Sequence, residues 1–123
     1  TSKVTDMRGM FTYSEVMMLD LSSFDTSNVT NMSWMFYESE ATEIKGLNKF
    51  NTSKVTDMRG MFTYSEVMML DLSSFNTSKV TRMSDMFERC EATTGYAKDA
   101  QTAAKFNNSA VTGIPDTLKF TVK

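Results

Sequence analysis

A tandem repeat is the feature that most constrains the fold of this chain. Residues 1–24 and 52–75 have the same sequence, TSKVTDMRGMFTYSEVMMLDLSSF. The shorter motif T-S-x-V-T-x-M begins at Thr1, Thr26, Thr52 and Thr77, which gives spacings of 25, 26 and 25 residues. A fixed period in this range is the signature of a solenoid, in which each repeat packs only against its neighbours. The repeat therefore predicts a fold and a surface, but it does not predict an active site.

The period divides the chain into repeats and a terminal unit. We assign four tandem repeats at 1–25, 26–51, 52–76 and, in part, 77–90, and a C-terminal cap at 91–123, all within one continuous domain. In the cap, Asp99 is expected to begin a helix that Asn107 and Asn108 end, and 118–122 alternates like a strand. Solenoids need such atypical units to cover an open face. The first repeat has no such cap, so we expect its open end either to be a liability for self-association or to be covered by residues outside this sequence.

The first part of each repeat is expected to form a short helix. Four apolar residues of the second repeat fall on one helical face: Val29, Met32, Met35 and Phe36. Thr26 or Ser27 is the expected N-cap, because a short hydroxyl can accept hydrogen bonds from the first turn. Asn31, Ser33 and Trp34 are expected to point towards solvent. The methionines that recur at the positions of Met7 and Met10 are expected to fill the core.

The second part of each repeat is expected to form a short strand. In the phrase Leu-Asp-Leu-Ser-Ser-Phe, Leu19 and Leu21 alternate with polar residues and should point inward. Stacked strands become parallel, and the helix supplies the crossover between them. The predicted fold class is α/β: a leucine-rich-repeat-like solenoid with short parallel strands on the concave face and short helices on the convex face. Stacked aromatic rings are expected at the corner after each strand, at Phe24, Phe50 and Phe75.

The outward residues of these strands form one candidate binding surface. The second repeat is one residue longer, and Gly46 is expected to form a bulge or kink that absorbs the extra residue. Lys45 would then lie between Asp20 and Asp71 in a row across the concave face. The row is interpreted either as a charge ladder that stabilises stacking or as a recognition surface. The candidate concave binding face comprises Met18, Asp20, Ser22, Lys45, Met69, Asp71 and Ser73.

Aromatic residues suggest a second candidate surface, on the convex side. Exposed tyrosine and tryptophan are favoured at the energetic centres of protein interfaces. The candidate convex aromatic patch comprises Tyr13, Trp34, Tyr37 and Tyr64.

The composition argues against several classes of chemistry. The chain has no histidine, which removes the usual general base and Ser-His-Asp or Cys-His catalysis. The one cysteine, Cys90, is expected to be a small buried hydrophobe rather than a reactive thiol. A net charge of −2 with mixed signs does not indicate nucleic-acid binding, and no stretch is long and apolar enough to span a membrane. We therefore expect no catalytic residues, no cofactor and no metal site.

The phrases LDLSSFDTSNVTNMSWMF at 19–36 and LDLSSFNTSKVTRMSDMFERC at 70–90 resemble a bacterial surface repeat. It is the BspA-like leucine-rich repeat of mycoplasma surface lipoproteins and Gram-positive cell-wall proteins, and the resemblance covers about residues 1–90. The family commonly has cysteine where this chain has Ser14, Ser39, Ser65 and Cys90. The resemblance implies an extracellular protein displayed on the bacterial cell surface or cell wall.

Two functions are compatible with these observations. The first is a non-enzymatic binding module that engages an extracellular protein or glycan in adhesion or host interaction. The second is a structural spacer of a cell-wall-anchored protein with no ligand of its own. The identity of 1–24 with 52–75 favours a spacer, whereas the divergent segment 38–49 favours a binding patch. A hydrolase is a distant third, because no acid, base or nucleophile set is recognisable.

Overall fold

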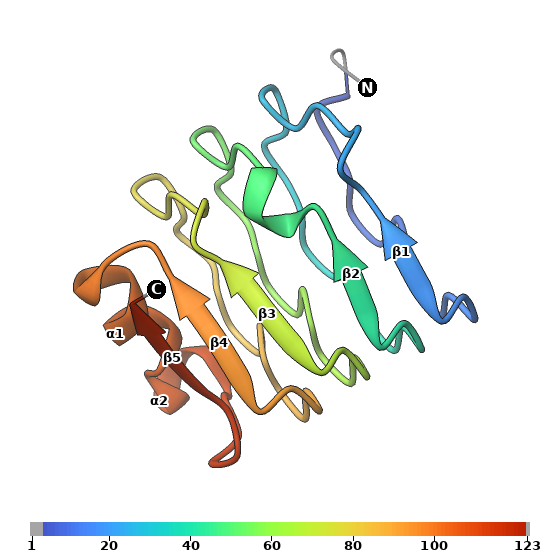
Figure 1. Ribbon diagram of the computed structural model, residues 1–123. Coiled ribbons are helices and arrows are strands. Elements are labelled where there is room, and N and C mark those ends of the chain that lie inside the picture. Colours follow the sequence, from blue (N-terminus) through green and yellow to red (C-terminus); the bar gives the residue numbers. More distant parts are fainter. Residues whose placement is uncertain (1–3, 123) are drawn as a thin grey trace.

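Short strands lie side by side in chain order in the computed structural model, which describes residues 4–122 (Figure 1). The strands are β1 (Met18–Asp20), β2 (Glu43–Lys45), β3 (Met69–Leu72), β4 (Thr94–Ala97) and β5 (Lys119–Val122). The helices are the 3-10 helix η1 (Leu47–Lys49) and the α-helices α1 (Ala100–Phe106) and α2 (Ser109–Thr112). The first and last strands lie at opposite ends of the array, and the segments between strands pass behind them (Figure 1).

The strands are parallel and form two hydrogen-bonded sheets, one of β1 and β2 and one of β3, β4 and β5. In the first sheet Leu19 pairs with Ile44, and in the second Leu70 pairs with Gly95, which pairs with Phe120. Leu19 and Leu21 are buried whereas Met18 and Asp20 are exposed. This alternation confirms the predicted strand and its inward face. We call the outward side of the strands the strand face.

The prediction of a short helix in each repeat is wrong. Residues 33–38 form consecutive turns, and Trp34 and Glu38 have φ angles of 60° and 52°, which no right-handed helix contains. Every second amide donates to the next repeat instead of back along its own segment, as Trp34 does to the Arg59 carbonyl at 2.8 Å. The hydroxyl of Thr26 is not an N-cap either, because it bonds across the stack to the Asn51 backbone. Ser33, expected to face solvent, is buried.

Apolar columns run through the interior of the stack. Four phenylalanine rings, at Phe11, Phe36, Phe62 and Phe87, stack nearly parallel at centroid distances of 5.6, 5.3 and 5.9 Å. The predicted corner column is formed in part: Phe50 and Phe75 stack at 6.2 Å, whereas Phe24 makes a tilted contact with Phe11. These rings tie each repeat to the next, because aromatic pairs add to the burial energy of each ring.

The recurring methionines are buried, as predicted, except at one position. Met7, Met32, Met58 and Met83 are at most 9% exposed, whereas Met10 is 44% exposed and its counterpart Met61 is 0% exposed. Met10 and Met61 lie in identical sequence, so their difference reflects only the neighbouring repeat. The first repeat has no repeat on its outer side within the described residues.

The C-terminal helix is confirmed. The Asp99 carboxylate accepts the Thr102 amide at 2.8 Å, so Asp99 caps α1, and Asn107 ends it. Asn107 also holds β5, since its side chain bonds the backbone amide and carbonyl of Phe120. Strand β4 was not predicted, because Gly95 and Ala97 stand where the third repeat has leucines. A Cβ at Gly95 would lie 2.5 Å from the Phe120 ring, which supplies the missing apolar volume.

Candidate functional site

The row of strands is interrupted between β2 and β3. The two strands belong to different sheets, and the interruption follows the extra residue of the second repeat. Gly46 adopts a left-handed conformation with φ 94° and leads into η1, which confirms the predicted kink. A Cβ at Gly46 would lie 2.5 Å from the Ser22 backbone nitrogen, so only glycine allows this corner to pack on the first repeat. The hydroxyl of Ser74 bonds the Leu47 carbonyl at 2.9 Å and ties η1 to the third repeat.

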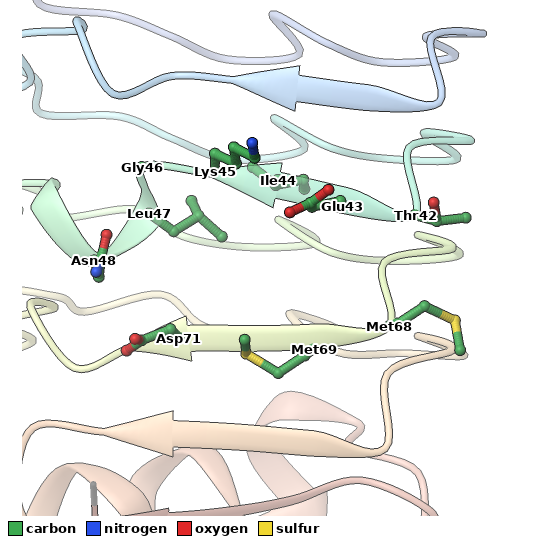
Figure 2. A pocket seen from close by; sticks show the side chains of 10 residues that line it. All are labelled: Thr42, Glu43, Ile44, Lys45, Gly46, Leu47, Asn48, Met68, Met69 and Asp71. Carbon is green, nitrogen blue, oxygen red and sulfur yellow. The ribbon is translucent and has the colours of Figure 1, made fainter.

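A cleft of about 550 Å³ opens on the strand face at this interruption, and we call it the β2–β3 cleft. Its lining combines charged, polar and thioether side chains, as Figure 2 shows. The lining residues are Thr42, Glu43, Ile44, Lys45, Gly46, Leu47, Asn48, Met68, Met69 and Asp71. Strand β2 and η1 supply one wall, and β3 with the residue before it supplies the other.

The two aspartates of the strand face are held by the same local turn. One carboxylate oxygen of Asp20 accepts the Ser22 hydroxyl at 2.6 Å and the Ser22 amide at 3.0 Å. Asp71 accepts from Ser73 in the same way, at 2.5 and 3.1 Å. The bonds from the Ser22 hydroxyl and amide, and then the Lys45 charge, lower the pKa of Asp20 below its usual value of 3.8. Both carboxylates are therefore oriented by the chain before any ligand arrives.

The predicted charge row forms only in part. Asp20 lies opposite Lys45 in the register of β1 and β2, but Lys45 and Asp71 lie on opposite sides of the interruption. In Figure 2 the Lys45 side chain extends towards β1, away from Asp71. The row is consequently not a continuous ladder across the strand face. Of the seven residues predicted for the concave face, three line the β2–β3 cleft: Lys45, Met69 and Asp71.

The other four predicted residues lie on the strand face outside the β2–β3 cleft. Met18 is 44% exposed, and its counterpart Met69 inside the cleft is 48% exposed. The two methionines therefore differ in their neighbours but hardly in their exposure. Ser22 and Ser73 are bonded to the aspartates beside them. The residues that sequence reasoning missed, chiefly Glu43, Asn48 and Met68, come from the divergent segment 38–49 and from the position before β3. The 26-residue spacing from Thr26 to Thr52 marks the repeat that contains Glu43 and Asn48, whereas no sequence signal distinguishes Met68 from its identical counterpart Met17.

The four aromatic residues of the predicted patch lie in the consecutive turns of the first three repeats, and their rings come together. Tyr37 makes edge-to-face contacts with Tyr13 at 5.6 Å, with Trp34 at 5.4 Å and with Tyr64 at 6.2 Å. The Arg89 guanidinium lies 5.7 Å from the centre of the Tyr64 ring. Trp34 is partly committed to packing, because its ring lies over Gly60, where a Cβ would be 2.1 Å from the indole. Tyr13 is the most exposed of the four, at 62%.

Cys90 is buried, as predicted, and burial raises its thiol pKa to about 11. It occupies the position of Ser39 and Ser65, whose hydroxyls accept the amide two residues later. Among residues 4–122, no group of three cysteine, aspartate or glutamate side chains is placed to hold a metal ion. The same residues include no helix that is long and apolar enough to cross a membrane.

Comparison with known proteins places the chain in a family. No curated protein and no solved structure matches it. A family described as "Mycoplasma protein of unknown function, DUF285" matches residues 1–100. Because this match spans most of the 123 residues, the chain belongs to the Mycoplasma DUF285 family.

Proposed function

We propose that this chain is a non-catalytic binding module that engages an extracellular protein or glycan through the β2–β3 cleft. We further propose that it is a BspA-like leucine-rich-repeat solenoid displayed on the bacterial cell surface, in which turns replace the convex helices. Membership of the DUF285 family and the sequence resemblance at 19–36 and 70–90 support this placement. Parallel strands joined at intervals of about one repeat support the architecture.

The observation that carries the binding proposal is the coincidence of the cleft with the divergent repeat. The first and third repeats are identical over 24 residues, and the β2–β3 cleft lies where the second repeat departs from them. Met68 and Met69 are 58% and 48% exposed beside it, and flexible thioethers adapt to varied apolar surfaces. Glu43, Lys45 and Asp71 add both signs of charge. Apolar contact flanked by charges is the usual composition of a recognition surface.

A spacer is the second candidate function. The identical repeats support it, because a spacer needs regular stacking and no particular surface chemistry. The inter-repeat hydrogen bonds and phenylalanine stacks would also transmit force along the array. In a spacer, the β2–β3 cleft would only accommodate the extra residue of the second repeat and would bind nothing.

The test uses the two equivalent strands as site and control. Met69→Lys with Asp71→Asn changes the β2–β3 cleft, and Met18→Lys with Asp20→Asn makes the same changes outside it. Asparagine preserves the serine-binding turn, as Asn31, Asn51 and Asn76 already show. The wild-type domain and both variants are immobilised and exposed to a glycan array and to purified extracellular-matrix proteins.

Saturable binding that the Met69/Asp71 variant loses and the Met18/Asp20 variant keeps is the expected result. Equal loss or equal retention in both variants would place the binding site elsewhere. If the folded wild type captured no protein and no glycan, the spacer function would be favoured. Circular dichroism of each variant establishes that the fold is intact.

A further inference from the structure

The outer face of the first repeat has the same sequence as a face that is covered elsewhere in the molecule. Residues 4–24 repeat 55–75 letter for letter, and the second repeat covers the latter segment. Val16 is 54% exposed whereas Val67 is 0% exposed, and Met10 is 44% exposed whereas Met61 is 0% exposed. Val4, Phe11 and Phe24 are likewise only partly buried. The molecule therefore shows directly which chemistry covers this face when a neighbour is present.

The contacts of the covered face define its neighbour closely. Four amides of the second repeat, on Met32, Trp34, Phe36 and Glu38, donate to carbonyls of Asp57, Arg59, Met61 and Thr63 at 2.8–3.0 Å. The Trp34 indole lies over Gly60, and the Phe36 ring stacks on Phe62 at 5.3 Å. A ligand for such a face needs a row of amides at two-residue spacing as well as two aromatic rings.

The first repeat is already shaped to receive the same contacts. Gly9 has φ 60°, as Gly60 has φ 61°, and Tyr13 has φ 59°, as Tyr64 has φ 57°. A Cβ at Gly9 would meet only the Thr12 side chain within 4 Å, so no ring fills the position that Trp34 occupies above Gly60. The carbonyls of Asp6, Arg8, Met10 and Thr12 accept no main-chain bond from another repeat within residues 4–122. The face is preorganised, which lowers the free-energy cost of docking.

We propose that this outer face, formed by Val4, Met10, Phe11, Val16, Phe24 and Gly9, is the docking surface for another repeat of the 26–51 type. That repeat would place its tryptophan over Gly9, stack its phenylalanine on Phe11 and donate four amides to the carbonyl row. A second copy of this chain does not fit these requirements. Two outer faces would oppose carbonyl to carbonyl, and the far end of the chain presents α1, α2 and β5 instead of a row of turns. Docking here is separate from ligand binding at the β2–β3 cleft.

The experiment adds a neighbouring repeat at a junction that the chain already uses. Residues 1–51 are duplicated ahead of Thr1, so the added Asn51 precedes Thr1 as Asn51 precedes Thr52. The original Trp34 is replaced by Phe, which leaves the added tryptophan as the only one. Its emission maximum and its quenching by acrylamide are compared with those of Trp34 in the unmodified chain. A matched fusion carries Gly9→Ala in the original copy, where the new methyl group would meet the indole.

We expect the added tryptophan to match Trp34 in emission and quenching, and Gly9→Ala to shift its emission to the red and increase its quenching. The urea midpoint should also rise above that of the unmodified chain, because an added interface stabilises a repeat array. Quenching equal to that of the urea-unfolded fusion would overturn the proposal. So would sedimentation of the unmodified chain as a dimer that Val16→Lys converts to a monomer, since the face would then belong to a second copy.

Discussion

Replacing one phenylalanine of the interior column should show how strongly the repeats are coupled. Phe62 is 0% exposed and stacks between Phe36 and Phe87 at 5.3 and 5.9 Å. Phe11 has the same sequence neighbours, but it lies at the end of the column and is only partly buried. Truncation of a fully buried phenylalanine to alanine costs about 3–5 kcal/mol through lost burial and the cavity left behind. We expect Phe62→Ala to cost this amount and Phe11→Ala to cost about half as much.

The assay is urea unfolding of both variants, followed by circular dichroism and by the fluorescence of Trp34, the only tryptophan. Coincidence of the two probes establishes that a single free energy of unfolding is defined. Equal losses in the two variants would refute the reasoning, because the sequence around both residues is identical and only their neighbours differ. A larger loss for Phe11→Ala would show that the open end of the stack, rather than its interior, limits stability.

Two further matched pairs extend this comparison. Gly60→Ala and Gly9→Ala share a left-handed backbone that costs about 1–2 kcal/mol for any side chain, but only at Gly60 would the methyl group meet Trp34, at 2.1 Å. Gly60→Ala should therefore lower the urea midpoint more, and equal shifts would contradict the structure. Burial opposes ionisation of Asp57, but the Arg59 side chain and amide outweigh it and hold the Asp57 pKa below 3.8. The stability that ionised Asp57 contributes is fully present above about pH 4, and it is lost as pH falls through the lower pKa of the folded state. The Arg8 amide and side chain also lower the pKa of Asp6, but that pair is exposed and screened by solvent. Asp57→Asn should therefore flatten the acid limb of stability against pH more than Asp6→Asn, and identical acid limbs would contradict this expectation.

The sequence predicts which side chains of the repeat are buried better than it predicts the backbone conformation. Val29, Met32, Met35 and Phe36 are all buried, as their spacing indicates. The same spacing was interpreted as a helix, and that step failed. Side chains spaced by three and one residues can all point inward in a helix, and they can do so in consecutive turns as well. The turns prevail here because they release alternate amides to the next repeat, whereas a helix would use those amides internally.

The candidate site could be predicted as a region but not as a cleft. The 26-residue spacing and Gly46 indicate an irregularity in the second repeat, and the structure has its kink there. A sequence pattern within one repeat carries no information on whether β2 still pairs with β3, because pairing depends on how both neighbours pack. The expected row through Asp20, Lys45 and Asp71 assumed that pairing. Its interruption opens the β2–β3 cleft, where Lys45 and Asp71 lie on opposite walls.

The identical segments 4–24 and 55–75 show why burial cannot be assigned to a repeat by itself. Their turns have closely similar φ angles, yet the Val16 side chain is exposed and the Val67 side chain is fully buried. Local sequence thus determines the conformation of each repeat, and the neighbour determines whether its apolar side is covered. It follows that the stability of this fold resides largely between repeats. The turns of the first repeat already have the φ angles of the covered segment, so its outer face should gain stability from a neighbour without rearranging its backbone.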